Sequence, residues 1–346
     1  MLTVDTMLKL EYRENIGQEG RNSEVNIAYD PQLNAELVVK KISKSEFTKV
    51  EDYFLEAQML YATEHPNIMG VRYATQDDNY IYIAMEYYKN GSLNSLIDKR
   101  YLTVNEIVKY SLEFLSGIHY MHTKELIHFD IKPTNILISN SNKAVVTDFG
   151  LAKYLNEHGF AQPDKLYPLH MPPETFKTGK FSFYTDVYQI GLTLYRMCNG
   201  NKIFYEQFEE SRELLDQQII EGKFPKKNHY LPHIPDKLQK IITKALTNDE
   251  TLRYESILDL INAISTIEDD LNWSYNECGN THSVYQYEDD NFVYSLEIKL
   301  DGSHWITEGY KVKKKDNTKT RVNKWNTKGH KSKDEVFKQV KRLLNA

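Results

Sequence analysis

The length and composition of the chain are those of a globular protein. Its 346 residues, 40% of them hydrophobic, suffice for two or three folding units with a sizeable core and exclude wholesale disorder. The two cysteines, Cys198 and Cys278, are too few and too far apart for a disulfide framework or a metal site. No apolar run is long enough to span a membrane and the N-terminus lacks a signal layout, so a cytoplasmic protein is expected.

Charge divides the chain into two parts. The formal net charge is −6, yet the segment from Lys299 to Ala346 carries 14 Lys and Arg against 5 Asp and Glu, a net of +9. The remaining residues therefore carry −15. A basic tail on an acidic body is the clearest compositional boundary in the sequence.

The N-terminal part predicts a β-rich unit with one helix. Residues 8–16 alternate apolar and polar side chains, as a half-buried strand does, and a turn with two glycines follows. Residues 37–42 and 81–85 predict further strands, and residues 50–63 have the amphipathic pattern of a helix. Taken alone, the glycine turn is equally consistent with an ordinary hairpin.

The middle of the chain contains a pattern suited to phosphoryl transfer. A helix is predicted over residues 103–122, starting with a capping box formed by Thr103 and Glu106. The loop at 128–135 then supplies Asp130, Lys132 and Asn135, and an Asp-Phe-Gly turn begins thirteen residues later at Asp148. Transfer of a phosphoryl group needs a carboxylate to orient a hydroxyl, a nearby lysine, and oxygen ligands for Mg²⁺.

This ordered set resembles the eukaryotic-like (Hanks-type) protein kinases over roughly the first 270 residues. The resemblance implies a bilobal α+β fold, with a β-rich N-lobe at 1–87 and a helical C-lobe at 88–271. It implies that Asp130 orients and deprotonates the acceptor hydroxyl, that Lys132 neutralises the moving phosphoryl group, and that Lys40 binds phosphate while paired with Glu56. A lysine two residues after the aspartate is similar to the Ser/Thr members of the family.

The resemblance also implies the cofactors, ATP and Mg²⁺, with Mn²⁺ as an alternative ion. Asn135 and Asp148 are the expected metal ligands. The glycine turn fits the family pattern in two registers, one with Gly20 and Ser23 on glycine positions and one that starts at Gly17. The residues expected to bind ATP are Ile16, Gly17, Gly20, Ser23, Val25, Val38, Lys40, Met85, Glu86 and Tyr88.

The chain departs from the family pattern at two functional positions. Phe129 replaces an arginine that usually pairs with a phosphorylated residue, and residues 148–174 contain no Ser or Thr. These two absences predict a non-RD kinase that is not switched on by Ser/Thr phosphorylation of this segment. Tyr167 stands where the family generally has a Thr bonded to the catalytic Asp and Lys, which leaves the substrate class open.

Other residues match structural positions of the family. The resemblance implies a buried ion pair between Glu174 and Arg253, and a role for Asp186 in supporting the catalytic loop from beneath. His128 and Phe149 are expected to act as packing elements, so His128 is not a general base.

The tail predicts a separate small module. Residues 272–291 show no clear periodicity and are interpreted as a linker or an extended segment. Residues 292–300 alternate strictly, Asp301 and Gly302 indicate a hairpin, strands are expected at 303–312 and 318–325, and Ser332 with Glu335 caps a helix. The prediction is a basic βββα module at 292–346.

The basic residues of the tail leave several interpretations open. They are Lys311, Lys313, Lys314, Lys315, Lys319, Arg321 and Lys324. They are consistent with a site for nucleic acid or another acidic partner, with docking on the acidic kinase body, with an unknown protein partner, or with a solvated face.

The sequence therefore predicts an ATP-dependent protein kinase that phosphorylates Ser and Thr of protein substrates. Three alternatives remain. The chain could be a kinase-like scaffold with little turnover, a small-molecule phosphotransferase, or a sensor whose basic tail binds nucleic acid or a protein.

Overall fold

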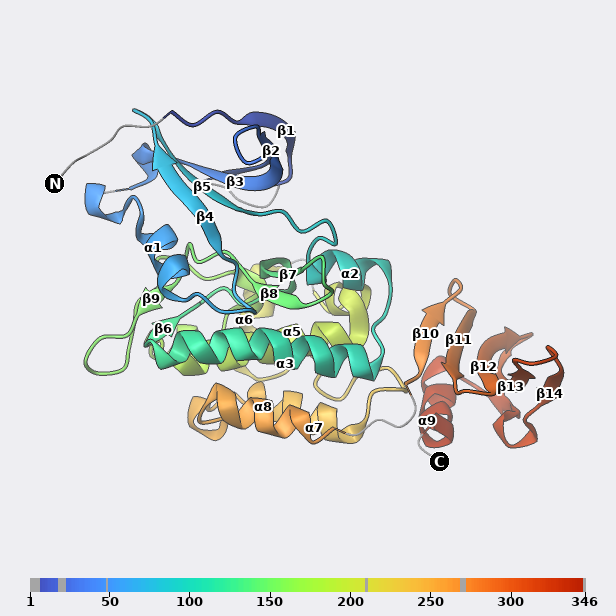
Figure 1. Ribbon diagram of the computed structural model, residues 1–346. Helices are drawn as coiled ribbons and strands as arrows, with labels where there is room; N and C mark the ends of the chain where they lie inside the picture. The colour runs from blue at the N-terminus through green and yellow to red at the C-terminus, as the bar shows by residue number, and fades with distance from the viewer. Residues whose placement is uncertain (1–6, 18–22, 48, 209–210, 268–271, 345–346) are drawn as a thin grey trace.

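The computed structural model describes residues 7–17, 23–47, 49–208, 211–267 and 272–344, and every structural statement below concerns these residues. The chain folds into a β-rich N-terminal lobe, a helical C-terminal lobe and a β-rich module at the C-terminus (Figure 1). The expected bilobal α+β fold with an added module is confirmed. None of the described helices is both long and apolar enough to cross a membrane.

In the described part of the N-terminal lobe, five antiparallel strands form one sheet in the order β1-β2-β3-β5-β4. The strands are β1 (Glu11–Asn15), β2 (Ser23–Asp30), β3 (Ala35–Ser43), β4 (Val71–Gln76) and β5 (Tyr80–Glu86). The first strand differs from its prediction, because all residues of β1 are exposed rather than alternately buried. It is an edge strand that pairs with β2 through its backbone.

The helix expected over residues 50–63 is shorter than predicted. A 3-10 turn occupies Val50–Asp52, and α1 (Leu55–Ala62) follows it. Its buried side chains, Ala57, Met59 and Leu60, pack into the hydrophobic core, and Glu56 lies in its first turn. The helix therefore carries Glu56 towards the sheet, as the prediction requires.

The C-terminal lobe is built around one buried helix, α5 (Phe183–Tyr205), which is kinked at Gly200. The helices around it are α2 (Leu93–Lys99), α3 (Val104–Thr123), α4 (Glu174–Lys177), α6 (Arg212–Ile220), α7 (Asp236–Ala245) and α8 (Ile257–Ser265). The predicted capping box of Thr103 and Glu106 starts α3. Two short ribbons, β6 (Leu126–Ile127) with β9 (Lys153–Tyr154) and β7 (Ile136–Ile138) with β8 (Ala144–Val146), flank the catalytic loop.

The C-terminal module is larger than predicted. Its described residues form a sheet in the order β10-β11-β12-β13-β14, and β15 also pairs with β13. The elements are β10 (Ser274–Glu277), β11 (His282–Glu288), β12 (Phe292–Asp301), β13 (His304–Lys313), β14 (Lys319–Arg321), β15 (Thr327–His330) and α9 (Lys333–Leu344).

The interpretation of 272–291 as a linker is therefore wrong, whereas the alternative of an extended segment agrees with its two strands. This segment contains β10 and β11, and the side chains of Tyr275 and Tyr285 are buried in the core of the module. Only short stretches alternate here, so the burial of the two tyrosines depends on contacts far away in the sequence rather than on a local pattern. The strand expected at 318–325 is shorter as well, because a 3-10 turn at Asn323–Trp325 follows β14.

The module packs against the C-terminal lobe through β10 and α9 (Figure 1). The ring of Tyr275 lies 4.8 Å from that of Tyr101 in the C-terminal lobe. Glu277 accepts hydrogen bonds from Lys202 of the lobe and Lys333 of α9, each at 2.9 Å. Burial lowers the pKa of His233 to about 4, so this residue stacks on Tyr275 as a neutral ring.

Candidate active site

Three charged side chains meet between the lobes, from three different elements. The Lys40 Nζ atom on β3 lies 2.8 Å from Glu56 Oε1 on α1 and 2.9 Å from Asp148 Oδ1 after β8. The side chains of Lys40 and Glu56 are only 12% and 13% exposed, whereas that of Asp148 is 45% exposed. The predicted Lys40–Glu56 contact is thus present, and Asp148 keeps an open surface that a ligand can reach.

The pKa values of this group follow from burial and from the neighbouring charges. Burial would lower the pKa of Lys40, but Asp148 and Glu56 outweigh it and raise that pKa. The Lys40 cation, against the opposing effect of burial, lowers the pKa of Asp148. Burial raises the pKa of Glu56, and Lys40 offsets only part of this effect. Lys40 is therefore a fixed cation and Asp148 a fixed anion at neutral pH.

Strand register puts the predicted apolar ATP residues on the same sheet face as Lys40. Val25 is paired with Lys40, and Val38 is paired with Met85. Directly opposed residues of neighbouring strands lie on one face, and residues two apart in a strand share that face. The neighbour Lys41 lies on the other face, where its ammonium group contacts Glu24 at 3.4 Å.

The glycine turn is only partly described. Gly20 lies outside the described residues. The backbone N–H groups of Ile16 and Gly17 both donate to the carbonyl of Val25, at 2.8 and 3.1 Å. A side chain at Gly17 would overlap the backbone of Val25, so the close approach of the two chain segments requires glycine there. Ser23 begins β2 and is paired with Ile42.

The hinge residues connect the two lobes at the end of β5. Glu86 is paired with Leu37 of β3, and its side chain bonds Arg72 at 2.7 Å. The carbonyl of Tyr88 accepts from the N–H of Gly91. The backbone therefore turns here, immediately before α2.

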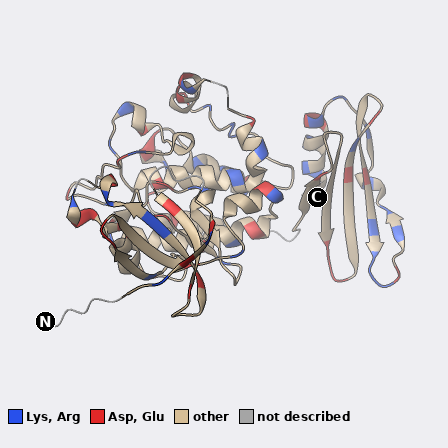
Figure 2. Ribbon diagram, turned by 90° about the horizontal axis from the view of Figure 1, so that it is seen from above, with Lys and Arg blue, Asp and Glu red and all other residues tan. Residues whose placement is uncertain are grey.

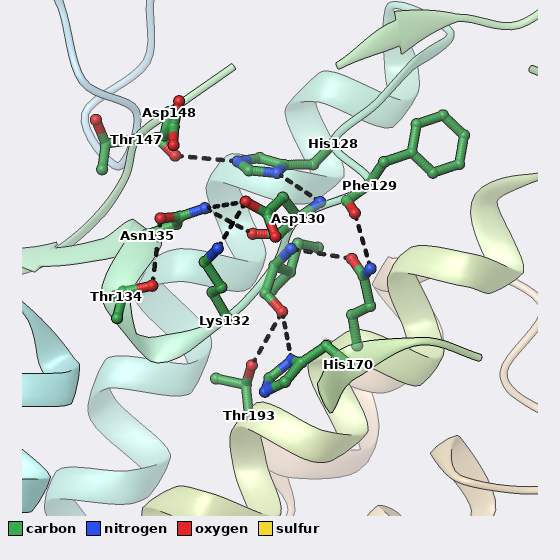
Figure 3. A network of polar contacts seen from close by, with 12 residues as sticks. His128, Phe129, Asp130, Lys132, Thr134, Asn135, Thr147, Asp148, His170 and Thr193 are labelled. Carbon is green, nitrogen blue, oxygen red and sulfur yellow. Dashed lines mark hydrogen bonds and ion pairs between the residues drawn. The ribbon is translucent and has the colours of Figure 1, made fainter. Parts of the chain in front are cut away.

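The catalytic loop brings Asp130, Lys132 and Asn135 together (Figure 3). Asp130 Oδ2 accepts from Lys132 Nζ and from Asn135 Nδ2, both at 2.9 Å. The other oxygen, Asp130 Oδ1, is buried and has no hydrogen-bond partner in the described part of the chain. A buried acceptor without a protein partner is free to accept a hydrogen bond from a group that enters the site.

Helix α5 supports this loop from below, as predicted for Asp186. The carboxylate of Asp186 accepts from the backbone N–H groups of His128 and Phe129 at 3.0 and 2.9 Å. A second residue of α5, Gln189, also bonds the loop and was missed by sequence reasoning. It is three residues after Asp186 and hence on the same helix face, a spacing that could have revealed it. The predicted structural ion pair is confirmed as well, because Arg253 lies 2.7 Å from Glu174.

His128 and Phe149 are packing elements, as expected. Both are buried, with ring centroids 5.4 Å apart. His128 Nε2 contacts the carbonyl of Thr147 at 3.1 Å, and the N–H of Asp130 donates to His128 Nδ1 at 3.3 Å. Because Nδ1 accepts, the ring proton is on Nε2, and the imidazole links the catalytic loop to the strand before Asp148.

A buried histidine joins the segment 148–174 to the catalytic loop. His170 Nδ1 lies 2.9 Å from the carbonyl of Ile131 (Figure 3). Arg196 of α5 lies 3.2 Å from His170 Nε2. Burial and then Arg196 lower the pKa of His170, so the ring is neutral and its proton is on Nδ1. Sequence reasoning missed this contact, because the partner of His170 is a backbone carbonyl, which no pattern of side chains reveals.

Phe129 is buried beneath the segment 148–174 rather than exposed to it. Its ring packs edge-on against Phe181, 6.3 Å away. Around these two rings lie apolar side chains of the segment and its neighbours, namely Leu151, Leu155, Ala161, Leu166 and Phe183. Tyr167 contacts the site differently, because Lys132 Nζ lies 4.4 Å from the centre of its ring. A cation over an aromatic face is attracted to it.

The oxygen donors present fit a hard divalent cation. Asp148 offers a half-exposed carboxylate, and the amide of Asn135 donates from Nδ2 to Asp130, which leaves its Oδ1 as an acceptor. Mg²⁺ is typically bound by one or two protein oxygens together with phosphates and water. No cluster of three His, Cys, Asp or Glu that could bind a metal occurs among the described residues.

Comparison with known proteins agrees with this geometry. Residues 10–263 match the sequence profile of the family described as "Protein kinase domain", and the chain belongs to this family. It is 26% identical over 260 residues to the probable serine/threonine-protein kinase PknB of Lactococcus lactis, which covers 72% of this chain and 41% of that protein. It is 28% identical over 263 residues to the serine/threonine-protein kinase PrkC of Bacillus subtilis, covering 72% and 39%.

The chain is also similar to a protein kinase from a eukaryote. The chain is 29% identical over 239 residues to cAMP-dependent protein kinase type 3 of Saccharomyces cerevisiae, covering 67% of this chain and 57% of that protein. The chain thus spans about two fifths of the length of the bacterial relatives it matches.

Proposed function

We propose that the chain is an ATP-dependent protein kinase that phosphorylates Ser and Thr hydroxyls of protein substrates. The observation that carries this proposal is the carboxylate of Asp130. One oxygen is fixed by Lys132 and Asn135, and the other is buried without a partner among the described residues. This oxygen is suited to accept a hydrogen bond from an alcohol that enters the site.

In the proposed reaction, Asp130 Oδ1 accepts the proton of the acceptor hydroxyl while that oxygen attacks the terminal phosphorus of ATP. Lys132, which contacts the other oxygen of Asp130, neutralises charge on the moving phosphoryl group. Lys40 binds the phosphates, and Glu56 fixes the direction of the Lys40 side chain. Asn135 and Asp148 would hold Mg²⁺, which supplies charge neutralisation at the phosphates when bound. The chemistry then depends mainly on alignment.

The adenine is proposed to lie against Val25, Val38 and Met85, which share the sheet face of Lys40. The hinge backbone supplies polar contacts through Glu86 and Tyr88. The carbonyl of Tyr88 already accepts from Gly91, so its N–H is the group we expect to bond the base.

Several observations favour this function over its alternatives. A scaffold with little turnover would be expected to have a defective site. Here Lys40 contacts both Glu56 and Asp148, and Lys132 orients Asp130. Relatives named as serine/threonine-protein kinases, PknB and PrkC, favour a protein hydroxyl over a small molecule.

The test is phosphate transfer from labelled Mg·ATP by wild type and by Asp130→Asn, followed by mapping of the labelled residues. We expect label on Ser or Thr, reduced about 10²- to 10⁴-fold in the variant, because the proton acceptor is lost. Label on Tyr would contradict the acceptor class. Nucleotide binding without any transfer by wild type would favour the scaffold.

We also propose that activity does not need Ser/Thr phosphorylation within residues 148–174. The packing of Phe129 under this segment supports the proposal, since apolar contacts replace the usual arginine–phosphate pair. The expected result is that treatment of the purified protein with a phosphatase leaves its turnover unchanged.

A third proposal concerns the basic edge, which we define as Lys311, Lys313, Lys314, Lys315, Lys319, Arg321 and Lys324. These residues belong to β13, β14 and the turns beside them, on the side of the module away from the lobes (Figure 2). The module contacts the lobes elsewhere, through Glu277 and Tyr275. We propose that the basic edge binds a polyanionic partner, for which nucleic acid is one candidate.

The basic edge is tested with the full chain and labelled single-stranded RNA, by fluorescence anisotropy at rising salt. The variant Lys319→Glu with Arg321→Glu is expected to lose binding. The matched control, Lys338→Glu with Arg342→Glu on α9, changes the charge equally and should retain it. Equal affinity of both variants contradicts the assignment, and binding of polyglutamate but not RNA would identify a protein partner.

A further inference from the structure

Gln189 of α5 bonds the catalytic loop at two points, one on each side of Asp130. Its side chain is fully buried. Gln189 Oε1 accepts from the backbone N–H of Ile131 at 2.9 Å, and Nε2 donates to the backbone carbonyl of Phe129 at 2.8 Å. The two peptide groups that flank Asp130 are therefore connected through one side chain.

Both bonds need a side chain that presents one acceptor and one donor side by side, as the carboxamide of Gln189 does. The N–H of Ile131 needs an acceptor and the carbonyl of Phe129 needs a donor, and the two groups lie within reach of one planar unit. These partners also fix the orientation of the amide, since a flipped Gln189 would place donor against donor and acceptor against acceptor. Both polar ends of a buried side chain are satisfied by the loop.

The bonded backbone is strained. Phe129 has a φ of +63°, the left-handed region that a bulky aromatic residue rarely adopts. The N–H group of Phe129 donates to Asp186, and the carbonyl of Phe129 accepts from Gln189. A strained conformation persists only where the surroundings over-determine it. The two α5 side chains provide this, one at each end of Phe129.

We propose that Gln189 is a positioning residue for phosphoryl transfer. By fixing the peptide groups before and after Asp130, it sets the direction of Oδ1 towards the acceptor hydroxyl. Gln189 bonds the catalytic loop and not Lys40, Glu56 or Asp148. Its loss is therefore expected to lower kcat without weakening nucleotide binding. This inference rests on the proposed kinase activity.

The first experiment compares Gln189→Leu with a matched control on the same helix. Asn199 is also fully buried and bonds another loop in the same way, donating to the carbonyl of His229 and accepting from the N–H of Leu231, both at 3.2 Å. Asn199→Leu removes comparable buried hydrogen bonds without touching the catalytic loop. We expect kcat to fall about 10- to 100-fold in Gln189→Leu alone, with the KM for ATP within about twofold.

The second variant, Gln189→Glu, has the same shape and gives a pH signature. An ionised carboxylate only accepts, so it opposes the carbonyl of Phe129. A protonated one again offers one donor and one acceptor. Burial raises the pKa of a glutamate at such a position. The ratio of kcat in Gln189→Glu to kcat in wild type should therefore rise as the pH falls from 8 to about 5.5.

These outcomes decide the proposal. Equal losses in both leucine variants, a Gln189→Leu enzyme within twofold of wild type, or a ratio that does not change with pH would each overturn it. A wild type without transfer would instead refute the proposed kinase activity. In that case hydrogen exchange at the Ile131 amide tests whether its hydrogen bond to Gln189 is formed. We expect protection in wild type and in Asn199→Leu, and its loss in Gln189→Leu.

Discussion

The nucleotide half and the acceptor half of the site are held by different forces. Lys40, Glu56 and Asp148 are fixed to one another by charge, and one of their carboxylates is 45% exposed. Around Asp130 the backbone is instead fixed by buried side chains of α5. Ionic contacts can be redistributed when a charged ligand enters, whereas buried hydrogen bonds are in place beforehand.

The difference indicates a division of tasks. Two carboxylates against one lysine leave the nucleotide half with an excess of negative charge, which a metal ion can satisfy. The acceptor half has no such excess of negative charge, because the charge of Lys132 balances that of Asp130. The nucleotide half is thus completed by its ligand, and the acceptor half is pre-organised. The following predictions test this distinction.

The largest effect is expected for Asp148→Asn. Loss of this carboxylate removes both a metal ligand and a partner of Lys40, so kcat should fall about 10²- to 10³-fold. Glu56→Gln should cost less, roughly 10- to 100-fold, because Lys40 keeps Asp148. Steady-state kinetics with Mg·ATP measure both. Glu24→Gln, which alters the partner of Lys41 on the outer face, is the control and should leave kcat unchanged. Equal losses of kcat at positions 56 and 148 would contradict the additional role of Asp148 as a metal ligand.

A stability effect is expected for the acceptor half. Phe129→Ala removes a fully buried ring beneath the segment 148–174 and should lower the free energy of unfolding by about 3–5 kcal/mol. Phenylalanine and alanine at position 129 would both have to adopt the left-handed backbone, so the change in unfolding free energy reports the loss of the ring. Phe160→Ala, in the same segment but 37% exposed, should cost much less. Denaturant unfolding measures this, and similar losses in both variants would refute apolar support by Phe129.

The parts of this molecule that could be predicted are those where chemistry fixes residue type and spacing. Lys40, Glu56, Asp130 and Asp148 were expected to lie together, and the structure brings each into a contact of the site. Such residues are recognisable because phosphoryl transfer constrains them one by one.

Contacts that depend on distant packing could not be predicted. Tyr275 is buried because β11 and the C-terminal lobe cover it, and nothing in its short strand shows this. Gln189 has its role because the catalytic loop, 58 residues earlier, passes over α5. The spacing of three residues from Asp186 places Gln189 on the same helix face, but its two backbone partners are known only from the fold.

The smallest effect concerns pH and the sign of one pKa shift. Lys40 lowers the pKa of Asp148, so the stability this carboxylate contributes is present above its ordinary value near about 4 and is lost as the pH falls through the lower folded value. The difference in unfolding free energy between wild type and Asp148→Asn should therefore be constant from about pH 7 to 5 and shrink at lower pH.

Removal of the lysine should weaken this dependence. In a Lys40→Met background the chief cause of the lowered pKa is gone, and burial then opposes only the remaining effects of His128 and Lys132 on the pKa of Asp148. The folded pKa of Asp148 therefore moves up towards its ordinary value, so the difference in unfolding free energy between Lys40→Met and its double variant with Asp148→Asn should change less as the pH falls than it does with Lys40 present. Denaturant unfolding of the four proteins at pH 3.5 to 7 measures both trends. The same trend in both backgrounds would show that Lys40 does not control Asp148, and that the nucleotide half is not held by charge.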